Sequence, residues 1–257
     1  PELLGKVFEN LLASYNPETQ QTARKQTGSF YTPREIVQYM VDESLVTHLK
    51  RTVGNELESE YRKLLDYADN EILLTEQQKL AIMQSLYNCK ILDPACGSGA
   101  FPVGVLQQMV HILKQIDPDN SRWKNMLLQF AIDETSEAYL NSTAEERREA
   151  VADIERAFDE NVNYPDYARK LHLIENCIYG VDIQPIAIQI SKLRFFISLV
   201  IDQKRNNNPA DNFGIRPLPN LEAKFVAANS LLGLKRTEAS LFLSLIHISE
   251  PTRPLYI

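Results

Sequence analysis

One stretch of the sequence decides the fold: Asp93-Pro94-Ala95-Cys96-Gly97-Ser98-Gly99-Ala100-Phe101. Before it lies a short apolar run over residues 89–93, which is typical of a buried strand. After it, residues 100–116 repeat apolar side chains at helical spacing. Glycines between a buried strand and a helix allow a tight turn and let a ligand approach the backbone. The stretch therefore predicts a strand, a turn and a helix of an α/β fold.

Two later segments continue this alternation of strands and helices. Short apolar runs over residues 177–182 and 224–228 are candidate strands, and Pro185 begins a strong helical pattern between them. The order strand, glycine turn, helix, strand, acidic residue, helix, strand is that of a doubly wound α/β sheet. The apolar side chains predicted to share one face of the helix after Pro185 are Ile186, Ile190, Leu193, Phe196, Ile197 and Val200.

Residues 1–88 are expected to form a helical region in front of the sheet, as a separate bundle or cap. Thr32 is a good helix cap and Pro33 suits the first helical position, so a helix is expected to begin there. Its predicted buried stripe consists of Ile36, Val37, Met40, Val41, Leu45 and Val46. The other helices predicted in this region cover residues 2–15, 55–68 and 75–87.

A net charge of −7 and a pI of about 5.3 limit how the chain could bind nucleic acid. A dedicated nucleic-acid clamp is usually basic, so a DNA-binding surface would be local or would lie on a part of the protein outside this chain. The small basic clusters are more typical of solvated faces than of phosphate sites. They are Arg24-Lys25, Lys192 with Arg194, and Lys235-Arg236.

Cysteine usage and hydropathy indicate the class of protein. Cys89, Cys96 and Cys177 are odd in number and form no CxxC pair, which favours reduced thiols over a disulfide framework or a zinc site. No run of about 18 apolar residues could span a membrane, and the first residues carry no secretory signal. We therefore expect a cytoplasmic protein without a metal site or a membrane partner.

The glycine turn differs from two common nucleotide-binding motifs. Pro102 stands where a dinucleotide fingerprint would have its third glycine, and no Gly-Lys-Ser/Thr follows as in a phosphate-binding loop. Asp93 would repel a pyrophosphate but would suit a cation, such as the ammonium of an amino-acid moiety. A simple tight connection from strand to helix remains the alternative.

Residues 93–101 resemble the S-adenosylmethionine motif of adenine-N6 DNA methyltransferases, in particular the methylase domain of combined type II restriction-modification enzymes of the Eco57I-like class. A second match, Thr27-Gly28-Ser29-Phe30-Tyr31-Thr32-Pro33, resembles the segment that reaches the methionine end of the cofactor in these enzymes. A capped helix start also offers free N–H groups to a carboxylate. Taken alone, Thr32 and Pro33 would be an ordinary helix cap.

Two further segments match the same family. In Tyr179-Gly180-Val181-Asp182-Ile183, the resemblance implies that Asp182 accepts both ribose hydroxyls and that Ile183 lies against the adenine ring. In Ala228-Asn229-Ser230-Leu231-Leu232, it implies that Asn229 binds the cofactor's adenine amino group. The alternatives are that Asp182 caps the following helix and that Asn229 is a plain turn residue.

The resemblance implies an incomplete Rossmann-like, doubly wound methyltransferase sheet over residues 89–242. It also implies a helical insertion over about residues 117–172, because Gly99 and Asp182 stand 83 residues apart, whereas the acidic residue usually follows the glycines by about 20. The cofactor-binding residues that it implies are Tyr31, Thr32, Pro33, Asp93, Pro94, Ala95, Cys96, Gly97, Ser98, Gly99, Asp182, Ile183 and Asn229.

One motif of the family is missing. The Asn/Asp-Pro-Pro-aromatic motif holds the flipped target base, and this sequence contains no Pro-Pro pair. Residues 243–253 resemble the translation of a transposase adapter used in preparing DNA libraries, so we expect residues 243–257 to be a non-native tail. The sequence thus predicts the cofactor-binding part of a bacterial restriction-modification methyltransferase that acts on DNA, with no catalytic residue of its own.

Three other functions remain open at this stage. The glycine turn alone would also suit a methyltransferase that acts on protein or RNA. A nucleotide-binding dehydrogenase is disfavoured by Pro102, and a regulatory subunit without catalysis would retain only the sheet. Affinity for S-adenosylmethionine would separate the enzyme from a scaffold.

Overall fold

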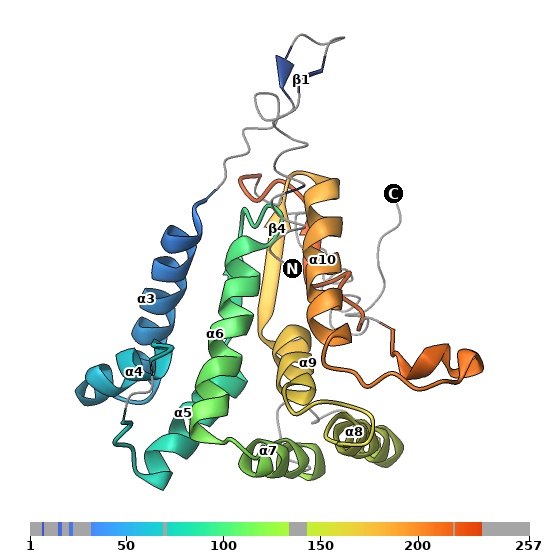
Figure 1. Ribbon diagram of the computed structural model, residues 1–257. Helices are drawn as coiled ribbons and strands as arrows, with labels where there is room; N and C mark the ends of the chain where they lie inside the picture. The colour runs from blue at the N-terminus through green and yellow to red at the C-terminus, as the bar shows by residue number, and fades with distance from the viewer. Residues whose placement is uncertain are drawn as a thin grey trace, which may run out of the picture.

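The computed structural model in Figure 1 describes an α/β protein. The described residues are 7, 15–16, 21–22, 32–68, 71–133, 143–217 and 219–232. Tyr31, most of the predicted helix over residues 2–15 and the tail over residues 243–257 lie outside them. A two-residue antiparallel pair, β1 (Tyr15–Asn16) with β2 (Gln21–Thr22), precedes the main body.

A three-stranded parallel sheet forms the centre, and all three predicted strands are confirmed. In the order β3-β4-β5, the strands are β3 (Ile91–Asp93), β4 (Ile178–Asp182) and β5 (Phe225–Ala227). Their order in the sheet follows their order in the chain, and their carboxyl ends meet at one edge. The described residues place strands on one side of β3 only, so the doubly wound, Rossmann-like arrangement stays a prediction.

Helix α6 (Ala100–Ile116) follows the glycine turn with the predicted bounds, and α10 (Pro185–Val200) connects β4 to β5. The rings of Phe195 on α10 and Phe225 on β5 lie 4.9 Å apart, which anchors the helix on the sheet. A Cβ atom at Gly180 would lie 2.7 Å from the Phe225 ring and 2.9 Å from Cys96 Sγ. Only glycine fits between the strand and the turn at this point.

The residues predicted to share one face of α10 form its less buried face, on which Ile190, Phe196, Ile197 and Val200 are half-buried. Ile186 is 55% exposed and Leu193 is 42% exposed. The buried face instead carries four polar residues among its apolar ones: Ser191, Lys192, Arg194 and Ser198. Apolar periodicity identified a helix face, but the polar groups on the other face turn inward because they find partners there.

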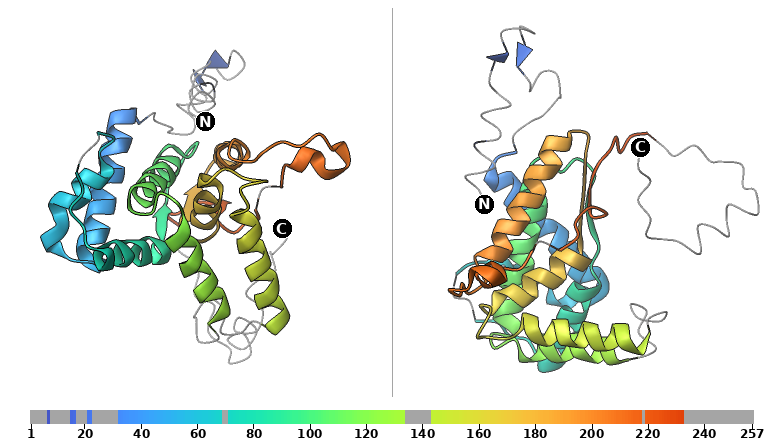
Figure 2. Two further views of the ribbon diagram at one scale, coloured as in Figure 1. Left: turned by 60° about the horizontal axis from the view of Figure 1, so that its bottom comes forward. Right: turned by 90° about the vertical axis from the view of Figure 1, so that its right-hand side faces the viewer.

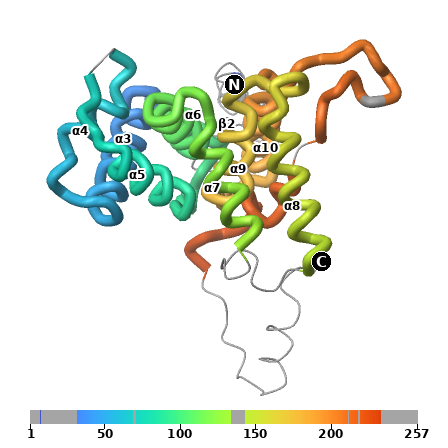
Figure 3. Tube along the Cα trace, turned by 90° about the horizontal axis from the view of Figure 1, so that it is seen from below, coloured from blue at the N-terminus to red at the C-terminus, as the bar shows by residue number. Residues whose placement is uncertain are grey.

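The region before the sheet contains α3 (Arg34–Thr52), α4 (Glu58–Leu65) and α5 (Glu76–Asn88), with a 3₁₀ turn η1 (Asn55–Leu57). These helices confirm the predicted ones. They share one continuous hydrophobic core with α6 and the sheet. Figure 3 shows α3, α4 and α5 on one side of α6, with α9 and α10 on the other. The proposed domain boundary at residue 88 stays a prediction.

Two details of α3 differ from the predictions. The helix begins at Arg34, and Pro33 occupies the cap position with no side-chain cap hydrogen bond, so Thr32 is not the cap. The extended ψ of 146° at Pro33 delays the helix start by one residue. Ile36 is 50% exposed and Met40 is 47% exposed. The side chains that α3 buries are Val37, Val41, Leu45, Val46 and Leu49.

The predicted insertion range contains α7 (Ser121–Ile132) and α8 (Ala144–Ala157), and α9 (Asp166–Asn176) extends slightly beyond it. Helices α7 and α8 pack against each other and project from the body (Figure 2, left). That they form an insertion stays a prediction. An aromatic cluster ties α5, α7 and α9 together through Tyr87, Trp123, Phe130 and His172.

Two further properties concern the cysteines and membranes. Cys89, Cys96 and Cys177 are free and buried. Within the described ranges, none of the helices combines the length and the apolar character that crossing a membrane requires.

Burial in the aromatic cluster lowers the pKa of His172 from 6.5 to about 3. The imidazole of His172 is therefore protonated near pH 6.5 in the unfolded chain but only near pH 3 in the folded chain. Stability contributed by the neutral ring is lost as pH falls through this window, by up to about 1.4 kcal/mol per pH unit. We predict that His172→Phe flattens the decrease of Tm between pH 7 and pH 4.5.

Thermal unfolding followed by circular dichroism across that pH range measures the effect. His111→Phe is a matched control, because it also removes a histidine that stacks on a tyrosine. Parallel pH profiles for wild type and His172→Phe would show that the buried ring does not govern acid stability.

Candidate functional site

The two acidic residues singled out in the sequence lie at the same edge of the sheet. Asp93 ends β3 and Asp182 ends β4, its neighbour in the sheet. The Gly97 N–H donates a 2.9 Å hydrogen bond to Asp182 Oδ2, although the residues are 85 positions apart. The structure therefore brings two of the predicted cofactor segments into direct contact.

Each carboxylate also fixes its own strand end. Asp93 Oδ1 accepts a hydrogen bond from the Ala95 N–H at 3.1 Å, and Asp182 Oδ1 accepts one from the Gln184 N–H at 2.9 Å. Asp182 thus accepts one hydrogen bond within its own turn and one from the glycine turn, while Gln184 occupies the N-cap of α10 without a side-chain cap hydrogen bond. The alternative that Asp182 caps the following helix is therefore wrong, and its role toward a ribose stays a prediction.

The turn depends on its two glycines in different ways. Gly99 has φ of 82°, in the left-handed region, and a Cβ atom there would lie 2.7 Å from Ser191 Oγ. Gly97 has φ of 53°, and a Cβ atom there would meet no atom within 4 Å. Gly99 is therefore packed against α10, whereas Gly97 borders open space into which a ligand could approach.

The buried face of α10 contacts the glycine turn through two side-chain hydrogen bonds. Ser191 Oγ donates to the Gly97 carbonyl at 3.0 Å, and Arg194 Nη1 donates to the Ser98 carbonyl at 2.9 Å. Lys192 Nζ pairs with Glu222 at 2.7 Å. The expectation that Lys192 and Arg194 form a solvated basic face is wrong, because both are buried, at 6% and 5% exposure.

Sequence reasoning missed Ser191 and Arg194 as functional candidates. A signal was available, since Ser191, Arg194 and Ser198 recur at intervals of three and four and share one face of a mostly apolar helix. A polar stripe within an apolar helix indicates partners for its hydrogen-bonding groups.

The carboxyl edge of the sheet carries two carboxyl groups, those of Asp93 and Asp182. Burial raises the pKa of Asp93 above its ordinary value, and the nearby negative charge of Asp182 raises it further. Burial also raises the pKa of the Cys96 thiol to about 12, so this thiol stays protonated. Two carboxylates beside an open backbone turn can attract a cation and accept hydrogen bonds from hydroxyl groups.

Thr32 and Pro33, at the start of α3, lie at the same end of the molecule as the glycine turn. Gly104 of α6 lies against Val37 and Val41 of α3, and Gln108 of α6 donates to Asp42 of α3 at 2.9 Å. These pairs advance together along both helices, so α3 and α6 run in the same direction. The start of α3 is therefore level with the glycine turn.

The remaining predicted residues lie around this edge. Pro94, Ala95 and Ile183 are exposed, with Ile183 at 61%, and Ser98 is buried. Asn229 is the second residue after β5, and the Ala228 N–H before it donates to the Asp182 carbonyl at 2.9 Å. The Asn229 side chain accepts a hydrogen bond from the Leu231 N–H at 3.0 Å, as a turn residue would.

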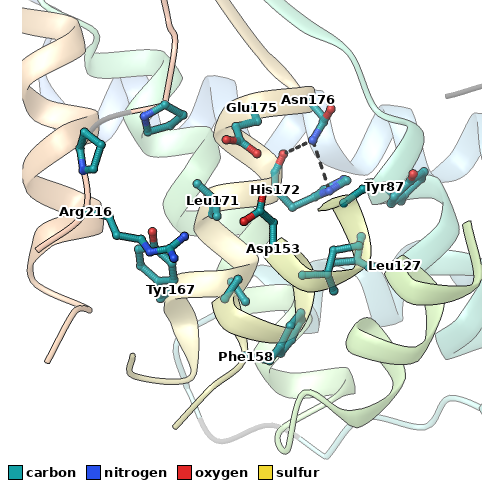
Figure 4. Close-up of a pocket in the computed structure, with 16 residues that line it drawn as sticks. Tyr87, Leu127, Asp153, Phe158, Tyr167, Leu171, His172, Glu175, Asn176 and Arg216 are labelled. Atoms are coloured by element: carbon teal, nitrogen blue, oxygen red, sulfur yellow. Dashed lines mark hydrogen bonds between the residues drawn. The ribbon is translucent and has the colours of Figure 1, made fainter. Parts of the chain in front are cut away.

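A cavity of about 400 Å³ lies elsewhere, between α7, α8, α9 and the residues Arg216, Pro217 and Pro219. Figure 4 shows Tyr167, His172, Glu175 and Arg216 around it. Glu175 and Asn176 precede β4, whereas Asp182 ends it, so the cavity lies at the opposite edge of the sheet. None of the predicted cofactor residues lines it.

The chain is similar to one curated protein of Methanocaldococcus jannaschii, named "Putative type II restriction enzyme and methyltransferase". The two are 27% identical over 245 residues, and the match covers 91% of this chain. The chain spans 16% of the length of that relative. No protein-family model matches the chain, and no solved structure matches it.

We predict that Asp93→Asn stabilises the fold near neutral pH. The raised pKa of Asp93 means that the folded state favours the protonated form, and this stability is lost as pH rises through the folded pKa. Asparagine removes the charge and keeps an acceptor for the Ala95 N–H. We expect Tm at pH 7 to rise by about 2–4 °C, the shift that roughly 1 kcal/mol produces at this chain length.

The gain should shrink as pH is lowered toward the ordinary Asp value of 3.8. Asp119→Asn is the matched control of opposite sign, because hydrogen bonds from Ser121 lower the pKa of Asp119. A lower Tm for Asp93→Asn at pH 7 would mean that the ionised Asp93 stabilises the fold.

Proposed function

We propose that this chain is the S-adenosylmethionine-binding part of a DNA methyltransferase in a restriction-modification enzyme, with adenine N6 as the methyl acceptor. The observation that carries the proposal is the contact between Asp182 and Gly97 at the carboxyl edge of the sheet. It joins two segments that resemble the cofactor motifs of one enzyme family. The name of the Methanocaldococcus jannaschii relative supports a methyltransferase that accompanies a restriction activity.

The residues at this edge fit the cofactor. A carboxylate can accept about four hydrogen bonds, and Asp182 accepts two from the turn and from Gln184, which leaves acceptor sites for ribose hydroxyls. Asp93 offers a negative charge to a cationic amine, and the open side of Gly97 leaves room for a ligand. Exposed Ile183 offers an apolar surface to the adenine ring.

Other residues complete the proposed site. Thr32 and Pro33, at the start of α3, would hold the methionine end together with Tyr31, which lies outside the described residues. Asn229 would contact the adenine amino group if its turn hydrogen bond to Leu231 is exchanged. Pro94, Ala95 and Cys96 would contribute backbone groups along the turn.

When bound, the cofactor supplies an electrophilic methyl group on a sulfonium. The chain's own residues would bind and orient it: Asp182 would hold the ribose and Asp93 the amine, with the glycine turn between them. Such positioning can supply a large part of the acceleration in a group transfer, because the reacting atoms must be aligned. We assign no catalytic residue to this chain, since its sequence lacks the Asn/Asp-Pro-Pro-aromatic motif.

DNA is favoured over protein or RNA as the substrate by two features. Residues 27–33 resemble the DNA enzymes specifically, and the relative is named as a restriction enzyme. With a net charge of −7, a DNA-binding surface would be local on this chain or would lie on other parts of the protein.

We predict that the chain binds S-adenosylmethionine and its demethylated product in isothermal titration calorimetry, and that NAD does not compete. Asp182→Ala should weaken binding by about 1–3 kcal/mol, because it removes hydrogen bonds to the ribose. Asp182→Asn, which keeps an acceptor for the Gly97 N–H, should weaken it less.

Asp153→Ala removes a carboxylate at the opposite edge of the sheet and should leave the affinity unchanged. No binding by the wild-type chain would refute the proposed function. Unchanged affinity in Asp182→Ala would remove only the role given to that residue.

We further predict that the chain alone transfers no labelled methyl group to DNA, because the motif that holds the target base is missing from its sequence. Methyl transfer is measured by scintillation counting of recovered DNA, and counts well above a no-protein control would contradict this prediction. A longer protein that contains both this chain and such a motif should yield N6-methyladenine by mass spectrometry. Methylated cytosine would contradict the adenine assignment.

A further inference from the structure

We infer that Ser191 and Arg194 of α10 are positioning residues for the glycine turn: they fix two of its carbonyl groups and thereby direct the Ser98 N–H toward the open side of the turn. The inference rests on the proposed function, because that open side is where we propose that the cofactor binds. It adds two residues that no cofactor motif of the sequence contains.

The contacts are specific and come from one helix face. Ser191 Oγ donates to the Gly97 carbonyl at 3.0 Å, and Arg194 Nη1 donates to the next carbonyl, that of Ser98, at 2.9 Å. The two residues are three positions apart and therefore neighbours on the helix surface. Adjacent peptide groups of the turn are held by adjacent side chains of α10.

Their burial indicates a dedicated role. Ser191 is 0% exposed and Arg194 is 5% exposed. Taking a cation out of water is unfavourable unless good geometry and further hydrogen bonds offset the loss of hydration. A buried arginine is retained where its planar fork of donors meets fixed acceptors, and here a turn carbonyl is one of them.

The geometry of the peptide bond gives the consequence. In a planar trans peptide the C=O and the following N–H point in opposite directions. Because the Gly97 carbonyl points to Ser191, the Ser98 N–H points away from α10, and it donates to no residue in the described part of the chain. The same turn borders open space at Gly97. An N–H held in this direction can donate to a ligand without reorganisation.

The β4–α10 segment also holds the other half of the turn. Cys96 N–H donates to the Val181 carbonyl at 2.9 Å, and Gly97 N–H donates to Asp182 at 2.9 Å. Gly97 is thus held at both its N–H and its carbonyl by one segment of chain. Asp182, the residue proposed to bind the ribose, therefore lies on the same β4–α10 segment that holds the turn.

The test uses the full chain with the variants Ser191→Ala, Arg194→Lys and Arg194→Met. Lys192→Met is the matched control, because it removes a buried cation from the same helix that pairs with Glu222 and not with the turn. Two quantities are measured: hydrogen exchange by mass spectrometry of peptides that contain residues 96–99, and affinity for S-adenosylmethionine by calorimetry.

We expect Arg194→Met to speed exchange at residues 96–99 relative to the rest of the chain and to weaken cofactor binding about 10–100-fold, since it leaves a buried carbonyl unpaired. Ser191→Ala should act in the same direction with a smaller effect. Arg194→Lys should restore part of both. Lys192→Met should lower Tm while changing neither turn exchange nor affinity more than about twofold.

Equal effects of Arg194→Met and Lys192→Met on turn exchange would overturn the inference, because a general loss of stability would explain both. If Arg194→Met does not fold, Ser191→Ala and Arg194→Lys decide, and unchanged turn exchange in both overturns it. If the wild-type chain binds no S-adenosylmethionine, the proposed function fails, while the exchange comparison still tests whether α10 positions the turn.

Discussion

The close approach of the glycine turn to the β4–α10 segment is the constraint on which the rest of the site depends. A side chain at Gly99 would collide with Ser191, and one at Gly180 would collide with Phe225 and Cys96. With glycine at these points, four hydrogen bonds join residues 96–98 to β4 and α10. The positions of the carboxylates at the two strand ends follow from this contact.

The constraint also explains why the buried face of α10 carries polar residues. Its inner face must supply donors to turn carbonyls that no strand or helix satisfies, because buried carbonyl groups require partners. Ser191 and Arg194 supply these donors, and Lys192 forms an ion pair with Glu222. Apolar side chains such as Ile186 and Leu193 are left on the outer face. The buried face therefore combines these polar groups with apolar side chains, namely Ala187, Ile188, Phe195 and Leu199.

Much of the fold could be predicted because its signals are local. The three strands are short apolar runs, two of which end in an aspartate, and α6 has the bounds that its periodicity indicated. The errors arose where tertiary contacts decide. Periodicity could not tell which face of α10 is buried, and Ile36 and Met40 of α3 fit the helical stripe although about half of each side chain is exposed. The start of α3 depended on the ψ angle of Pro33, which the sequence does not specify.

In the candidate site, too, local signals could be predicted from the sequence and tertiary contacts could not. Asp93 and Asp182 could be proposed from the chain alone, because each stands at the end of a recognisable strand, and parallel strands bring such ends to one edge. The 83 residues between Gly99 and Asp182 did not prevent this, since the entropic cost of closing a loop grows only slowly with its length. The polar stripe of Ser191 and Arg194 indicates buried partners, but it does not say which ones, because the contacts to residues 97 and 98 span more than 90 positions. The pairing of β3 with β4 specifies where the candidate site lies. The orientation of α10 specifies how the backbone groups of the glycine turn are held.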